Sequence, residues 1–164
     1  MHLIEQASAH EAFRRWFEYL KSINVSTLGY VIMPNHFHGI FHIPDECTKT
    51  INQILANGKR FIAYDIVKGL EKLKKETVLQ ELFHSTSNKA KQNGKKHRVF
   101  KTSSDIKEIY SVNMLITKLE YMHRNPCQGK WNLADDYATY RYSSAGFYEI
   151  EKSDVLLTDY RRMY

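Results

Sequence analysis

Two histidines flank a phenylalanine in the stretch Met33-Pro34-Asn35-His36-Phe37-His38, and apolar residues lie on either side of it. This composition predicts a buried strand within Thr27–Ile43. Because side chains alternate between the two faces of a strand, His36 and His38 should share one face while Phe37 points to the core. Two imidazoles on one rigid face could supply half of a metal site.

A second group of polar side chains falls on a helix predicted over Ser111–Arg124, with Ser111 as N-cap and Pro126 ending it. Lys118, Tyr121 and Asn125 recur at helical spacing. A tyrosine hydroxyl, an amide oxygen and an ammonium should therefore project from one exposed face of this helix.

These two groups together suit phosphodiester chemistry. Mg²⁺ or Mn²⁺ accepts few protein ligands and keeps positions open for phosphate oxygens, and His36, His38 and Asn125 would be three such ligands. Tyr121 would be the nucleophile, with its phenolate favoured by the metal or by Lys118. The product would be a phosphotyrosine bond, which a free DNA 3′-OH could reverse without ATP. Taken alone, a His-x-His pair is more often structural, and a helical tyrosine more often belongs to the core or the surface.

Helices must position these groups. Ala9–Ile23 should form one, with an apolar stripe that belongs to the core. Thr50–Leu73 should form another, which Gly58 and Gly69 are expected to weaken and could break or bend. In the polar stretch Thr77–Lys96, the second half is typical of a mobile loop.

The remaining expectations concern residues 97–101, which could form a short strand, and an aromatic, irregular tail from 131 to 164. Helices alternating with few strands indicate an α+β protein. The length of 164 residues suits a single domain.

The net charge of +6 is unevenly distributed. Residues 57–101 hold 12 Lys and Arg against 4 Asp and Glu, so all of the excess positive charge lies there. Concentrated positive charge favours a polyanion such as nucleic acid, and a solvated, lysine-rich face explains it about equally well. The 11 tyrosines and 8 phenylalanines favour nucleic acid slightly, because bases stack on aromatic rings.

Composition also bounds the location. No apolar run approaches the roughly 18 residues of a membrane span, and the first residues lack the pattern of a signal peptide. Cys47 and Cys127 do not make a disulfide framework. We therefore expect a cytoplasmic protein with no membrane partner.

Three segments in order resemble the single-tyrosine HUH transposases, and most closely their REP-associated branch. They are Met-Pro-Asn-His-Phe-His at 33–38, Tyr-Met-His-Arg-Asn-Pro at 121–126, and Tyr137 followed by Tyr-Ser-Ser-Ala at 142–145, within a similarity from about residue 10 to 150. The resemblance implies a ferredoxin-like antiparallel sheet with helices packed on one face. It also implies a metal-dependent nickase and strand transferase, acting on single-stranded DNA near hairpins.

Residue by residue, His36 and His38 match the histidines of the family, Tyr121 the nucleophile and Asn125 the third metal ligand. We interpret His123 as structural, either capping the helix or bonding to the tail, because it lies on a different helix face. DNA phosphates should contact the basic segment 57–101. The candidate contacts are Lys59, Arg60, Lys89, Lys91, Lys95, Lys96 and Arg98.

One departure concerns the start of the fold. Family members begin with a strand inside the sheet, and Met1–Ser8 is short and polar. We expect this first strand to be missing or rudimentary: the chain is truncated, a partner such as a second copy fills the gap, or Leu3-Ile4 forms a stub. Two other functions stay open, a DNA-binding relative without catalysis and a metal-dependent phosphoesterase that uses water.

Overall fold

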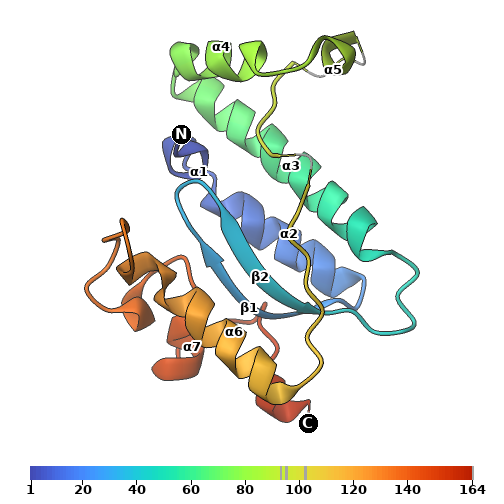
Figure 1. The fold of residues 1–164 in the computed structure, drawn as a ribbon, viewed down its shortest axis with the longest axis vertical. Helices are drawn as coiled ribbons and strands as arrows, with labels where there is room; N and C mark the ends of the chain where they lie inside the picture. The colour runs from blue at the N-terminus through green and yellow to red at the C-terminus, as the bar shows by residue number, and fades with distance from the viewer. Residues whose placement is uncertain (93, 95, 102, 164) are drawn as a thin grey trace.

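The computed structural model describes residues 1–92, 94, 96–101 and 103–163. At its centre is an antiparallel hairpin of β1 (Ser26–Ile32) and β2 (Phe37–His42), shown in Figure 1. The sequence predicted one strand within 27–43 that holds both histidines; the strand with Phe37 and His38 is confirmed, but a second strand precedes it and His36 lies in the turn between them. Pro34, which has no N–H to donate, and Asn35 occupy a turn that the Met33 amide closes by donating to the His36 carbonyl over 2.8 Å.

One face of the hairpin packs on α2 (His10–Ser22), which confirms the predicted helix. The Phe37 ring lies 5.2 Å from that of Phe13 and 5.8 Å from that of Trp16, centroid to centroid. The predicted stripe is buried and forms the core of this side; its members are Phe13, Trp16, Phe17 and Leu20.

Behind α2 lies α3 (Ile51–Lys72), which begins in a capping box between Thr50 and Gln53. It runs unbroken through both of its glycines, contrary to the expected break or bend. A side chain at Gly58 would overlap the Trp16 ring, and one at Gly69 would overlap the Ala7 carbonyl. Both glycines therefore serve the close approach of α3 to its neighbours, which offsets their low helix propensity.

The other face of the hairpin packs on α6 (Val112–Arg124), the predicted third helix. Gly29 of β1 lets α6 approach, because a side chain there would overlap Leu119. Helices thus lie on both faces of the hairpin rather than on one, which corrects that part of the implied arrangement. The buried residues that α6 and the hairpin share are Leu28, Val31, Met33, Ile40, Leu115, Leu119 and Met122.

The tail covers the outer edge of β1. It follows η1 (Asn125–Cys127) and contains η2 (Tyr137–Thr139), α7 (Ala145–Glu149) and η3 (Tyr160–Arg162). The Ile32 amide donates to the Tyr142 carbonyl over 2.8 Å, and the Ser144 amide donates to the Tyr30 carbonyl over 2.9 Å. This edge strand is therefore satisfied by residues more than a hundred positions away.

The first residues form a short helix, α1 (Leu3–Gln6). Ile4 is buried, and its amide donates to the Pro34 carbonyl over 3.0 Å, so the segment packs on the turn of the hairpin. The alternative in which Leu3-Ile4 forms a stub of strand is therefore wrong.

Two further predictions fail after α3. The second half of 77–96 was predicted to be a mobile loop, but it contains the short helix α5 (Asn88–Gln92). Before it lies α4 (Glu76–His84), which the buried side chain of Leu82 anchors to the core. Residues 97–101 form no strand; the Arg98 amide instead donates to the Leu82 carbonyl over 3.4 Å.

The α+β class, with helices packed against an antiparallel sheet, is confirmed. Within the described residues, the sheet has two strands. No helix in the described part of the chain is long and apolar enough to cross a bilayer. Both cysteines are free thiols.

Candidate metal and nucleophile site

The two histidines lie together at the turn of the hairpin. Their ring centroids are 5.0 Å apart, and the rings are nearly perpendicular. His38 pairs across the hairpin with Val31, whose side chain packs in the cluster with α6. Cross-strand partners share a face, so His38 lies on the α6 side while Phe37 lies on the α2 side. The predicted alternation of this segment is confirmed.

A hydrogen bond to Asn35 orients the His36 ring. The Asn35 Oδ1 atom lies 2.6 Å from His36 Nδ1, and an amide oxygen only accepts. The proton is therefore placed on Nδ1, and Nε2 keeps its lone pair for a metal. Asn35 is the orienting residue that the sequence analysis missed, although it stands directly before the first histidine.

Both imidazoles favour the neutral form. Burial lowers the pKa of His36, and nearby His38 and Lys130 lower it further. Burial also lowers the pKa of His38, while Asp105 acts in the opposite direction. A neutral imidazole is the form that binds metal, so this surrounding suits a ligand pair at neutral pH.

Helix α6 holds the other candidate residues. It begins at the Ser111 cap, whose hydroxyl accepts from the Met114 amide over 3.2 Å. Tyr121 is 63% exposed, Lys118 is exposed, and Asn125 is half-buried at the C-cap. These three lie on one flank of the helix, away from the buried stripe.

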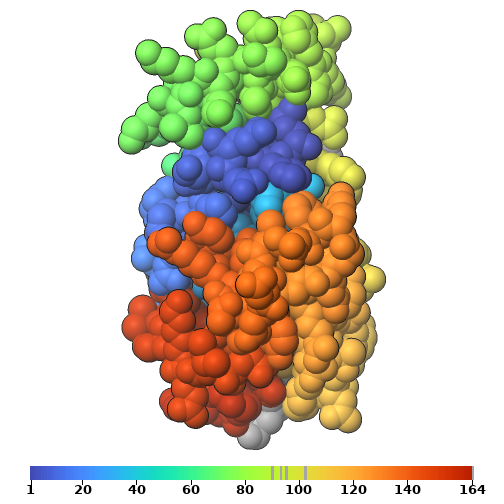
Figure 2. All heavy atoms as spheres, turned by 90° about the vertical axis from the view of Figure 1, so that its left-hand side faces the viewer, coloured from blue at the N-terminus to red at the C-terminus, as the bar shows by residue number. Residues whose placement is uncertain are grey.

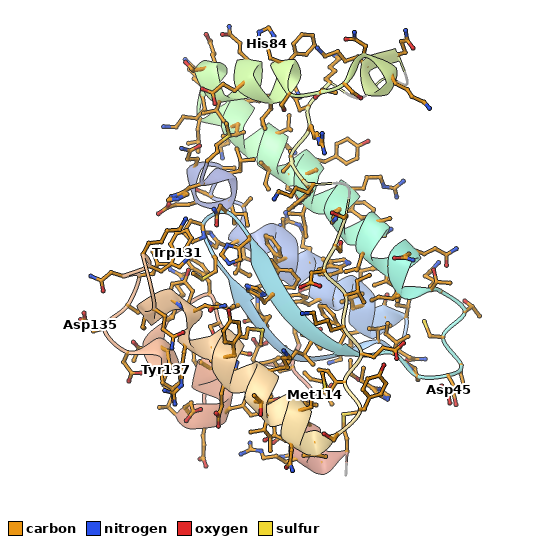
Figure 3. The ribbon with its side chains drawn as sticks, viewed as in Figure 1. Asp45, His84, Met114, Trp131, Asp135 and Tyr137 are labelled. Carbon is orange, nitrogen blue, oxygen red and sulfur yellow. The ribbon has the colours of Figure 1, made fainter. Side chains whose placement is uncertain are left out.

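The aromatic ring of Trp131, after the end of α6, lies beside the histidine pair. Its centroid lies 5.9 Å from that of His36 and 5.4 Å from that of His2. In Figure 3, Trp131 lies near the turn of the hairpin, whereas Met114, from the start of α6, lies at the opposite end. The chain that leaves the C-terminal end of α6 therefore returns to the histidine pair within six residues of Asn125.

The structure thus brings His36 and His38 into contact, on the side of the hairpin that carries α6. It places the C-terminal end of α6 toward the same turn (Figure 1). Among the described residues, no three His, Cys, Asp or Glu side chains form a metal-binding group. A metal held by the histidine pair would need a ligand of another type, and the amide oxygen of Asn125 suits Mg²⁺ or Mn²⁺ chemically.

His123 is structural, as predicted, and bonds to the tail. Its Nε2 atom lies 2.7 Å from the Ser144 hydroxyl, which also accepts from the Tyr30 amide over 2.8 Å. Burial lowers the pKa of His123 to about 4, so the ring is neutral. This His123–Ser144–Tyr30 connection ties α6, the tail and β1 together. It gives a physical reason for the spacing of Tyr-x-His-x-Asn-Pro and Tyr-Ser-Ser-Ala.

The predicted phosphate contacts lie elsewhere, along α3 and around α4 and α5. Figure 2 shows this end (green) separated from α6 and the tail (orange) by the N-terminal residues (blue). Lys59 is committed to the fold: its ammonium donates to the carbonyls of Lys101 and Ser103 over 2.9 and 3.0 Å, and burial lowers its pKa. Lys91 lies 4.0 Å above the centre of the Phe83 ring.

The other predicted contacts are exposed, with one exception. Lys95 lies outside the described residues. The exposed members of this group are Arg60, Lys89, Lys96 and Arg98.

Comparisons with known proteins give no further guide. No family model matches the chain, and neither a curated protein nor a solved structure matches it.

Proposed function

We propose that the protein is a metal-dependent endonuclease and strand transferase for single-stranded DNA, acting near hairpins through a covalent phosphotyrosine intermediate. The observation that carries the proposal is the histidine pair: two imidazoles in contact on the α6 side of a rigid hairpin, one of them oriented by Asn35. The proposal also draws on the resemblance of the sequence to the single-tyrosine HUH transposases.

In this proposal His36, His38 and Asn125 hold Mg²⁺ or Mn²⁺, which when bound withdraws charge from the scissile phosphate. The Tyr121 oxygen attacks phosphorus, so the bond between Oη and phosphorus forms and the bond from phosphorus to the DNA 3′ oxygen breaks. The released 3′ oxygen takes up a proton, and its later attack on the phosphotyrosine reverses the step. Lys118 lies one turn before Tyr121 on the same flank of α6, so it places a positive charge near the attacking oxygen.

The exposure of Tyr121 supports this role. A phenol that is 63% exposed and three residues from a lysine is accessible to a polymeric substrate without unfolding of α6. The opposite flank of the same helix is held by His123, so the nucleophile would sit on an element that is fixed to the sheet.

The test is an incubation with Mn²⁺ and a labelled single-stranded hairpin oligonucleotide, followed by denaturing electrophoresis. The wild-type chain should carry the label covalently, and EDTA or Tyr121→Phe should abolish this. Tyr110→Phe is the matched control, because Tyr110 is 81% exposed and lies outside α6. An adduct that survives Tyr121→Phe contradicts the assignment of the nucleophile.

A DNA-binding protein without catalysis is the second candidate. Its specific support is that the exposed basic residues around α4 and α5 lie apart from the histidine pair and need no metal. It predicts hairpin binding that weakens with salt, forms no adduct and is unchanged by His36→Ala.

A further inference from the structure

We propose that the solvent-facing side of α3 is a second binding surface for single-stranded nucleic acid, remote from the histidine pair. We call it the α3 stripe and define it by Arg60, Phe61, Tyr64 and Lys68. Only the identification of the bound strand as DNA rests on the proposed function. Binding at the stripe does not depend on metal or on Tyr121.

The stripe presents large aromatic rings to solvent, on the side of α3 away from the buried core. The buried positions of α3 face α2 and include Ile62 and Ile66. On the opposite side, Phe61 is 49% exposed and Tyr64 is 69% exposed. These two rings are three residues apart, so they are neighbours on the helix surface.

Both borders of the stripe are fixed by contacts to other segments. On one side Lys59 donates to the carbonyls of Lys101 and Ser103. On the other, Asp65 accepts from Arg15 of α2 over 2.8 Å. The rings between these borders therefore stand on a helix that is held in place, and their presentation costs little ordering on binding.

The charges around the rings suit a polyanion. The Arg60 guanidinium lies 5.1 Å from the centre of the Phe61 ring, and Lys68 lies one turn after Tyr64. Exposed Lys96 and Lys101 belong to the segment that borders the stripe. The acidic neighbours are Asp65, which is paired with Arg15, and Glu71, at the far end of the stripe.

This combination favours a nucleic acid strand over a protein partner. Bases stack on aromatic rings without regard to sequence, while interleaved cations bind the phosphates between them. Because α2 packs between α3 and the hairpin, the stripe lies across the molecule from α6 (Figure 1). A strand bound at the histidine pair would reach the stripe only if it extended well beyond the cleavage point.

The test measures binding without free metal ion, so that metal-dependent cleavage does not occur. A fluorescein-labelled, unstructured oligothymidine of about 16 nucleotides, near the upper end of known site sizes, is titrated with the full chain in EDTA, and anisotropy is recorded at several salt concentrations. The double variant Phe61→Ala/Tyr64→Ala should weaken binding at least fivefold, which corresponds to about 1 kcal/mol from base stacking. Tyr64→Phe keeps the ring and should restore most of the affinity lost by Tyr64→Ala.

Tyr110→Ala removes another exposed tyrosine, outside the stripe, and should leave the affinity as in the wild type. The proposal is overturned if the double variant binds as tightly as the wild type, if Tyr110→Ala weakens binding equally, or if the wild type does not bind the strand. Failure of the proposed function is a separate outcome, because it would appear as the absence of a Mn²⁺-dependent adduct whatever the affinity in EDTA.

Discussion

The two faces of the hairpin differ in what they bury. On the α2 side, Phe37 and Phe41 pack against the rings of Trp16 and Phe17, and the apolar cluster is the larger one, although Arg14 and Tyr30 also bond to Asp154 there. On the α6 side the apolar cluster is smaller and is joined by polar connections. These include the bond between His123 and Ser144 and the contact between His36 and Asn35.

This difference follows from alternation along one short strand. Phe37 supports the fold, while His36 and His38, one position away on either side, face the helix with the candidate nucleophile. Because the core residues and the histidines lie on opposite sides of the hairpin, substitutions at one side should leave the other side unchanged. The comparison therefore predicts large stability effects on the α2 side and small ones at the histidine pair.

The largest effect is expected from Phe17→Ala on the α2 side. Phe17 is fully buried, and its ring contacts those of Tyr30, Phe37 and Phe41. Loss of the ring should lower the free energy of unfolding by about 3–5 kcal/mol, measured by urea denaturation. A loss below about 1 kcal/mol would show that this face is not the main source of stability.

Acid should weaken the α6 side through His123. Because burial lowers the pKa of His123 to about 4 from its usual 6.5, the unfolded chain binds this proton more readily than the folded one. Stability is therefore complete above about pH 6.5 and falls as the pH drops toward 4, by about 3 kcal/mol from this residue. Burial lowers the pKa of His10, His36 and His38 as well, so they act in the same direction.

The contribution of His123 is isolated by comparing the wild type with His123→Gln, which keeps a polar partner for Ser144. Between pH 7 and 4, the free energy of unfolding of the variant should fall less steeply. Parallel curves for the two proteins would contradict the assignment of the buried neutral imidazole.

The smallest effect on stability is expected from His38→Ala. This side chain is partly desolvated but keeps substantial exposure to solvent and lies outside the apolar clusters, so its removal should change the free energy of unfolding by less than about 0.5 kcal/mol. Mn²⁺ affinity, measured by isothermal titration calorimetry, should nevertheless fall at least tenfold. A variant that unfolds like Phe17→Ala, or that binds Mn²⁺ unchanged, would remove the distinction between the two faces.

Local patterns predicted much of this molecule. The apolar stripe located α2, the Ser111 cap and Pro126 bounded α6, and alternation placed His36 and His38 on one side. In each case the signal lies within a few residues of the feature, so the sequence contains it directly.

The failures have a different cause. Helix α4 packs because Leu82 meets a core built from distant segments. The turn at Pro34 was not predicted, because the apolar residues around it are typical of a continuous strand. Trp131 approaches His36 only because the chain doubles back after α6. Such features depend on long-range contacts, which a single sequence does not display.

The most direct test of the central claim is to locate the DNA adduct by mass spectrometry. Trypsin should release residues 119–124 as one peptide, with Tyr121 as its single tyrosine, whereas Tyr110 falls on the preceding peptide. After incubation with Mn²⁺ and hairpin DNA, followed by nuclease and trypsin digestion, the peptide 119–124 should carry the nucleotide mass. Absence of an adduct, or its attachment to any other peptide, would contradict the account.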